Sequence, residues 1–198
     1  MPNHPDNKMT QALALLRRNG LTRLSEFRRE GITAATISRL ETAGTVLRLA
    51  RGLYQLPEAV ADPNHTLAEA SKLVPKGIIC LTSALAFHEL TDQVPARVWL
   101  AIGPKGWRPR LEYPPMRFAH FSIKQLRAEI EHHCTDGVSV PIYSIIKTIA
   151  DLFRDSRIVG INVAIEGLRE TIRRQKTTPR DIARCATDVG VWKVMEPW

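Results

Sequence analysis

The chain has 198 residues, of which 44% are hydrophobic and 24% charged, a composition typical of a soluble globular protein with one domain or two small ones. No apolar run approaches the roughly 18 residues that a membrane span needs, and the N-terminus MPNHPDNKMTQ has no apolar signal core, so we expect a cytoplasmic protein that binds no membrane. Cys80, Cys134 and Cys185 lie too far apart for a zinc ribbon or a redox motif, so we expect buried, reduced thiols.

Positive charge is concentrated near the N-terminus. The formal net charge is +8, and residues 1–56 alone hold nine basic and four acidic residues. The remaining 142 residues hold 19 basic and 16 acidic residues. A basic N-terminal quarter favours a polyanionic partner such as DNA, although basic balance alone is weak support.

The first 56 residues predict three helices followed by a β-hairpin. The helices are expected over 8–18, 22–29 and 33–43, with Gly31 and Gly44 ending the second and third and Thr33 capping the third. Residues 46–49 and 53–56 then read as two strands joined by a turn that contains Gly52. This order is the layout of a winged helix-turn-helix DNA-binding domain.

The third of these helices has two different faces. At 100° per residue, Ile37 and Leu40 point inward with Ala34 beside them, whereas the outward face carries small or polar residues and one arginine: Ala35, Ser38, Arg39 and Thr42. Small residues let a helix approach the floor of the major groove, where Arg39 would donate to a guanine or grip a phosphate. Arg48 and Arg51 of the hairpin would reach the backbone or minor groove nearby. The alternative is a small helical domain with an ordinary solvated face.

Pro57 and the polar segment that follows predict a linker over 57–64, and residues 65–198 predict a mixed α/β domain. Its expected strands are 97–102, 116–121 and the pair 131–134 and 138–143 around the turn Asp136-Gly137. Residues 78–81 are expected to form a short buried strand or the lead-in to the next helix. Its expected helices are 65–74, one that starts at Thr82 or Ser83, a short one after Ser122, 144–154, 162–174 and 178–189. Residues 103–115 form a long basic loop in which Trp107 is the best candidate for a partner contact.

The helical last third carries a run of basic side chains. Arg169 and Arg173 share a helix face at i, i+4, and Arg174 follows, which predicts a basic ridge able to contact the DNA backbone. An ordinary solvated face is the alternative.

Chemical sites have little support in the sequence. Lys147, Asp151 and Glu166 are the residue types of a nuclease-like set, but Lys147 and Asp151 are spaced i, i+4 on one helix, where an ion pair is the ordinary explanation. The histidines are scattered, with adjacent His132 and His133 pointing to opposite faces of a strand. Without a Gly-x-Gly-x-x-Gly or P-loop motif, we predict no catalytic residue, no cofactor and no metal.

Four segments resemble the AbiEi family, the antitoxins and transcriptional regulators of AbiE-type toxin–antitoxin systems. They are IICLTSALAFHELTDQVPARVWLAI, IYSIIKTIADLFR, AIEGLRETIRRQKTTP and KVMEP, which follow the winged-helix start. The resemblance extends from about Lys8 to Pro197 and implies an N-terminal winged helix followed by a mixed α/β antitoxin domain. It carries a DNA-binding role onto Thr33, Ala35, Thr36, Ser38, Arg39, Thr42, Arg48, Arg51 and Gly52, with Arg23 as a further candidate.

The resemblance also implies a function. Such a protein binds inverted repeats in the double-stranded DNA of its own promoter, with one copy on each half, and represses the operon without chemistry. It also counteracts a toxin with a nucleotidyltransferase fold encoded beside it. Two other readings stay open: a protein–protein interaction module whose winged helix no longer reads DNA, and a nuclease.

Overall fold

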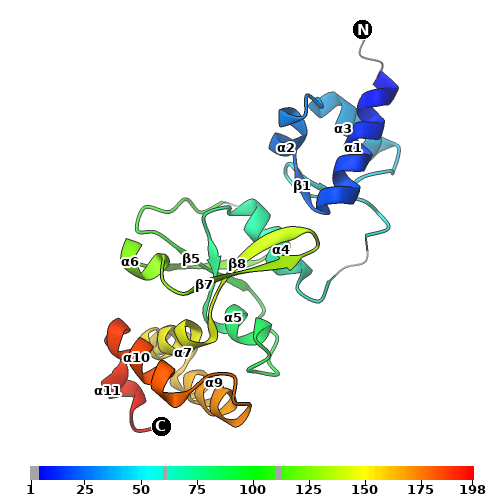
Figure 1. Ribbon diagram of the computed structural model, residues 1–198. Helices are drawn as coiled ribbons and strands as arrows, with labels where there is room; N and C mark the ends of the chain where they lie inside the picture. The colour runs from blue at the N-terminus through cyan, green and yellow to red at the C-terminus, as the bar shows by residue number, and fades with distance from the viewer. Residues whose placement is uncertain (1–4, 60–61, 110–112) are drawn as a thin grey trace. The chain divides into compact units, whose positions relative to one another are not determined.

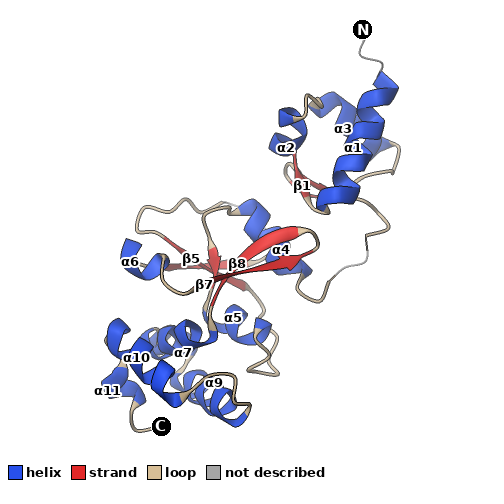
Figure 2. Ribbon diagram, in the orientation of Figure 1, coloured by secondary structure: helices blue, strands red, loops and turns tan. Residues whose placement is uncertain are grey.

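A computed structural model describes residues 5–59, 62–109 and 113–198. The chain divides into two compact units, the first comprising residues 1–75 and 134–139 and the second residues 76–133 and 140–198. Figure 1 traces the chain through both, and Figure 2 shows that each combines helices with strands. The mixed α/β class predicted from the sequence is confirmed.

The N-terminal part of the first unit is a winged helix. Its helices are α1 (Pro5–Asn19), α2 (Leu24–Arg29) and α3 (Ala34–Thr42). Its strands are β1 (Thr22–Arg23), β2 (Leu47–Ala50) and β3 (Leu53–Gln55), which form an antiparallel sheet in the order β1-β3-β2. The two predicted strands of the wing are therefore joined by a third from before α2.

Thr22 and Arg23 are the one misassigned pair in this region, since we expected them in a helix. Thr22 is instead fully buried and pairs with Tyr54, while Arg23 pairs with Leu53. The Arg23 amide donates to Glu26 Oε2 at 2.7 Å, so the helix begins only at Leu24. A β-branched, buried Thr at a sheet edge gains a strand partner there that a helix would not provide.

One apolar core holds α1, α2, α3 and the wing together. Phe27, fully buried, meets the Tyr54 ring edge-on with the ring centroids 6.1 Å apart. The inward residues predicted for α3, Ile37 and Leu40, belong to this core. Ala34 does not, because it lies exposed in the first turn of α3.

The first unit also contains α4 (His65–Leu73) and the tip of the hairpin β7–β8. His65 Nδ1 lies 2.6 Å from Asp136 Oδ2, and the amide of Asp62 donates to Asp136 Oδ1 at 3.3 Å. Lys72 donates to Glu26 Oε1 at 2.8 Å, which ties α4 to α2. The predicted linker over 57–64 thus lies inside one contact unit, and its status as a domain boundary stays a prediction.

The second unit is built on a five-stranded mixed sheet in the order β6-β5-β4-β8-β7. Its strands are β4 (Ile78–Ile79), β5 (Val98–Ile102), β6 (Met116–His120), β7 (Ile130–Thr135) and β8 (Val138–Tyr143). β5 runs antiparallel to β4 and parallel to β6, and β4 runs parallel to β8. All five residues of β5 are buried, as expected for a strand inside a sheet covered on both faces.

Two helices of the second unit lie between strands of the sheet in the chain, and the others follow β8. They are α5 (Leu81–Phe87), α6 (Ile123–Leu126), α7 (Ile145–Arg154), α8 (Ser156–Val159), α9 (Ile161–Arg173), α10 (Pro179–Val189) and α11 (Trp192–Met195). α7 contacts α5, α9 and α10 and is the centre of this group (Figure 1). The caps predicted at Ser122, Ser144 and Thr178 are confirmed, because each side-chain oxygen accepts a backbone N–H of the first turn.

Two expectations for the chain after the winged helix are wrong. α5 starts at Leu81, before Thr82 and Ser83, and the Ser83 hydroxyl accepts instead from the Trp99 amide at 2.9 Å. Cys80 and Cys185 are buried free thiols as expected, but Cys134 is exposed. Burial raises the pKa of the Cys185 thiol to about 11, so that thiol stays protonated.

Candidate DNA-reading surface

The N-terminus of α3 is fixed by two threonines. Thr33 Oγ1 accepts from the Thr36 amide at 3.2 Å, and the two hydroxyls lie 3.0 Å apart. Both hydroxyls are therefore engaged in capping the helix. Gly31, with φ +68°, turns the chain between α2 and this cap. The candidates Thr33 and Thr36 thus position the helix that carries the other side chains.

The outward face of α3 presents one long cation among small side chains. Ala35, Ser38, Arg39 and Thr42 are all exposed. Thr42 donates its hydroxyl to the Ser38 carbonyl at 2.9 Å and keeps its acceptor lone pairs. Within residues 5–59, 62–109 and 113–198, Arg39 makes no hydrogen bond or ion pair, so its guanidinium is available for a base edge or a phosphate.

The wing holds two more exposed arginines. Arg48 Nε donates to the Ala50 carbonyl at 3.4 Å across a β-bulge, and Arg51 occupies the turn. Gly52 has φ +75°, and its carbonyl accepts from the Leu24 amide at 2.8 Å. Gly52 therefore shapes and anchors the wing. Arg23, half-buried in β1, lies at the base of α2 instead of on α3 or the wing tip.

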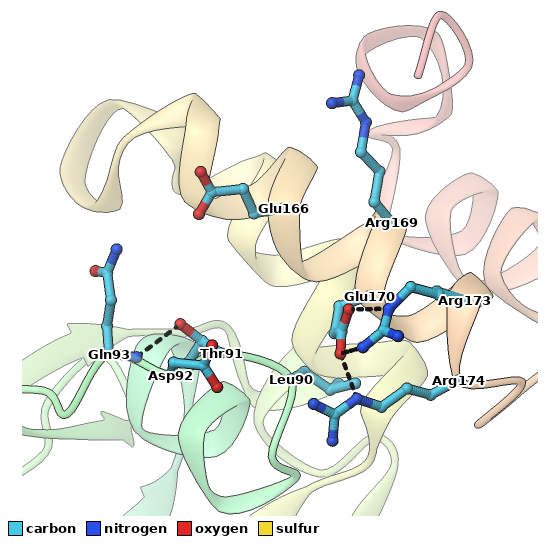
Figure 3. A pocket seen from close by; sticks show the side chains of 9 residues that line it. All are labelled: Leu90, Thr91, Asp92, Gln93, Glu166, Arg169, Glu170, Arg173 and Arg174. Atoms are coloured by element: carbon cyan, nitrogen blue, oxygen red, sulfur yellow. Dashed lines mark hydrogen bonds and ion pairs between the residues drawn. The ribbon is translucent and has the colours of Figure 1, made fainter.

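The arginines predicted as auxiliary DNA contacts surround a hollow of about 400 Å³ in the second unit (Figure 3). Glu170 occupies its wall and accepts from Arg173 Nε at 2.7 Å, from Arg173 Nη2 at 2.6 Å and from Arg174 Nε. These bonds lower the pKa of Glu170 to about 2. Glu166 and Asp92 line the same hollow, so the ridge is less basic than its arginines alone suggest.

Arg169 differs from its two neighbours. In the part of the chain that the structure describes, it pairs with no carboxylate, and Figure 3 shows it directed away from Glu170. The spacing i, i+3 and i, i+4 from Glu170 to Arg173 and Arg174 is visible in the sequence and would have identified the paired arginines.

Of the three nuclease-like residues, two are paired in the core and the third is exposed. Lys147 and Asp151 form a buried ion pair at 2.5 Å, and Arg154 Nη1 lies 2.7 Å from Asp151 Oδ1. Burial lowers the pKa of Lys147 and raises that of Asp151, since each charged form loses its hydration, and the ion pair opposes both shifts. Glu166 is exposed on the face of α9 that borders the hollow.

Aromatic rings complete the surroundings of this ion pair. Lys147 Nζ lies 4.7 Å from the Tyr143 ring centroid and 5.0 Å from that of Phe121, and the Arg154 guanidinium lies 4.0 Å from the latter. A cation enclosed by rings and one carboxylate is a structural core element.

Metal and membrane sites are not indicated. Among the described residues there is no group of three His, Cys, Asp or Glu side chains able to hold a metal ion. His88 Nε2 bonds to the Tyr143 carbonyl at 2.8 Å, and His133 Nε2 lies 3.0 Å from Glu131 Oε2, so both rings have protein partners. No helix within the described ranges is long and apolar enough to cross a membrane.

Sequence reasoning missed the contacts that join distant segments. Glu26–Lys72 and His65–Asp136 pair residues 46 and 71 positions apart, and no local pattern marks such partners. Strand β1 could not be predicted for the same reason, because Thr22 and Arg23 form a strand only through their pairing with β3.

The comparisons with known proteins agree with this geometry. Residues 11–57 match the family described as transcriptional regulator, AbiEi antitoxin. No curated protein matches the sequence. The fold is similar to a crystal structure of the RV2827C protein from Mycobacterium tuberculosis, with a TM-score of 0.56 and 12% identity over 92% of this chain and 75% of that one. The matched residues lie in α1, α2, α3 and the wing, so the winged helix of this chain is similar to the AbiEi antitoxin family of transcriptional regulators.

Proposed function

We propose that this protein represses its own toxin–antitoxin operon by occupying inverted repeats in the promoter DNA. The observation that carries the proposal is the outward face of α3, where the unpaired Arg39 stands among small exposed side chains on a helix capped and packed from behind. That shape fits the major groove, with the wing arginines beside the backbone. Bound copies block polymerase by occlusion, and no chemistry is required.

The second half of the proposal is neutralisation of a nucleotidyltransferase-like toxin encoded next to this gene. Its support is the match of residues 11–57 to a family of antitoxins. Co-expression with the neighbouring gene is the direct test: that gene alone should arrest growth, and this chain should restore it. Growth arrest that this chain does not relieve would remove the antitoxin role while leaving repression intact.

The test of DNA reading compares the protein's own upstream DNA with scrambled DNA in mobility shifts at two salt concentrations. We expect Arg39→Ala to lose about 1–3 kcal/mol of discrimination at one base position, because a bidentate contact to guanine is lost. We expect Arg51→Ala to weaken binding to all sequences alike, because a phosphate contact carries no sequence information.

The main competing function is a protein–protein interaction module whose winged helix does not read DNA. It predicts equal binding to own and scrambled DNA, with a steep salt dependence for both. A nuclease, in contrast, would cleave the same DNA when a divalent metal is added.

A further inference from the structure

A cluster of unpaired positive charge lies in the second unit, far in sequence from the winged helix. Residues 103–128 contain six basic residues and one acidic residue, Glu112. The five basic residues that the structure describes are all exposed: Lys105, Arg108, Arg117, Lys124 and Arg127. Within the described part of the chain, none of them forms a salt bridge, whereas Arg154, Arg173 and Arg184 of the following helices all do. Such a segment repels itself unless an anion covers it.

Arg108 lies against one edge of the sheet. β6 is an edge strand, and the loop after β5 folds back against it. The Arg108 guanidinium lies 5.9 Å from the Phe118 ring centroid and bonds to the His120 imidazole, whose Nδ1 lies 3.2 Å from the Gly103 carbonyl oxygen. This loop–edge surface, as we name it, comprises Lys105, Trp107, Arg108, Phe118, His120 and Lys124.

Helix α6 borders the same surface. A Cβ built on Gly103 would lie 3.7 Å from Ile123 Cδ1 and 3.8 Å from Leu126 Cδ2, so α6 packs against the start of the loop. Lys124, an exposed residue of this helix, adds a further positive charge to this part of the second unit.

An exposed aromatic ring lies among these basic residues. Trp107 is 68% exposed and is flanked in sequence by Lys105 and Arg108. An indole in that position offers a π-face to a flat partner between two phosphate-binding cations. Duplex DNA presents phosphates but conceals its base faces inside the stack, so it would contact the cations and make no stacking contact with the Trp107 ring. A single strand would contact the cations through its phosphates and the Trp107 ring through an unpaired base.

We propose that the loop–edge surface binds single-stranded nucleic acid, with an unpaired base stacked on Trp107 and phosphates contacting Lys105 and Arg108. In the sequence of residues 103–128, six basic residues stand against one acidic residue, Glu112, and this excess favours a uniformly anionic chain over a protein surface, which usually carries both signs of charge. This binding is separate from the duplex reading proposed for α3 and does not depend on it.

The test is fluorescence anisotropy with the full chain and labelled oligomers of dT and of U, each about 15 nucleotides long. We expect both to bind, with quenching of tryptophan fluorescence, and the tighter of the two identifies DNA or RNA as the source. Trp107→Ala should weaken binding about tenfold, as expected when base–aromatic stacking is lost, and Trp107→Phe should retain most of it. The double variant Lys105→Ala, Arg108→Ala should weaken binding and flatten its salt dependence.

Two controls separate this surface from the rest of the molecule. Lys193→Ala removes another exposed lysine of the second unit, on α11, and should change nothing. Arg39→Ala should affect operator duplex and leave oligomer binding intact. Failure of the duplex experiment therefore says nothing against this proposal.

Three results would overturn it. One is a lack of measurable binding to either oligomer. Another is equal binding by the wild type and Trp107→Ala, which would leave only a non-specific positive patch. The third is displacement of the oligomer by poly-glutamate as efficiently as by unlabelled dT, which would indicate a surface for an acidic protein.

Discussion

At the scale of single residues, pairing within the protein decides which arginines can serve a partner. Arg39 is exposed and unpaired within the described chain, whereas Arg173 shares Glu170 with Arg174. Exposed ion pairs of this kind contribute little to stability, but they occupy the donors that would otherwise reach a phosphate. Two exposed arginines, such as Arg39 and Arg173, can therefore have different roles.

Arg169 and Arg173 provide a matched pair for the proposed auxiliary DNA contact. Arg169→Ala should reduce the slope of log affinity against log salt for operator DNA by about one, since one phosphate contact is lost. Arg173→Ala should change the slope less, because its guanidinium is already bound by Glu170. Mobility shifts over a salt series measure both, and an unchanged slope in Arg169→Ala would exclude α9 from the DNA interface.

Asp151 gives a prediction about stability. Asp151→Ala should lower the free energy of unfolding by about 3–5 kcal/mol, because Lys147, only 1% exposed, would be left as a buried charge without its counter-ion. The double variant Lys147→Met, Asp151→Leu should unfold closer to the wild type, since the buried lysine charge is removed together with its partner and Arg154 keeps its ion pair with Asp155. Urea denaturation followed by circular dichroism checks this, and a double variant as unstable as the single one would contradict it.

At the scale of elements, the caps and the glycine turns were the most predictable features. Thr33, Ser122, Ser144 and Thr178 all cap helices as predicted, because capping depends on one side chain and a backbone amide three residues away. The starts of α2 and α5 were misplaced because strand pairing of Arg23 and the Ser83–Trp99 bond involve residues elsewhere in the chain.

The candidate site was predictable in part for the same reason. Helical periodicity gave the outward face of α3, whereas the capping roles of Thr33 and Thr36, and the anchoring of the wing by Gly52, depend on contacts that a list of polar residues does not reveal. The pairing of Arg173 and Arg174 with Glu170 was readable from spacing alone.

The cap of α3 is testable by itself. Thr33→Ala should lower the free energy of unfolding by about 1 kcal/mol, because the Thr36 amide loses its acceptor. Thr42→Ala is the matched control, since its exposed hydroxyl donates only to a carbonyl of the same helix. Thermal unfolding of the two variants provides the measurement, and equal melting temperatures would rule out a stabilising role for the cap.

At the scale of the whole molecule, the proposed repression requires two copies on one operator. An operator with both inverted repeats should give two shifted species as protein is added, and one with a single repeat should give one. Analytical ultracentrifugation of the complexes would count the copies. A single copy covering both repeats would contradict the arrangement of one winged helix per half-site.

The hairpin tip has a consequence for the order in which this protein can be made. Residues 134–139 belong to the first unit, and a Cβ on Gly137 would meet the Asn19 carbonyl oxygen at 2.9 Å, so the turn approaches the end of α1 backbone to backbone. Because translation runs from the N-terminus, the whole winged helix is synthesised long before Asp136, the partner of His65. The nascent chain completes its N-terminal unit only after residues 134–139 have been synthesised, and a fragment cut at Pro75 never does.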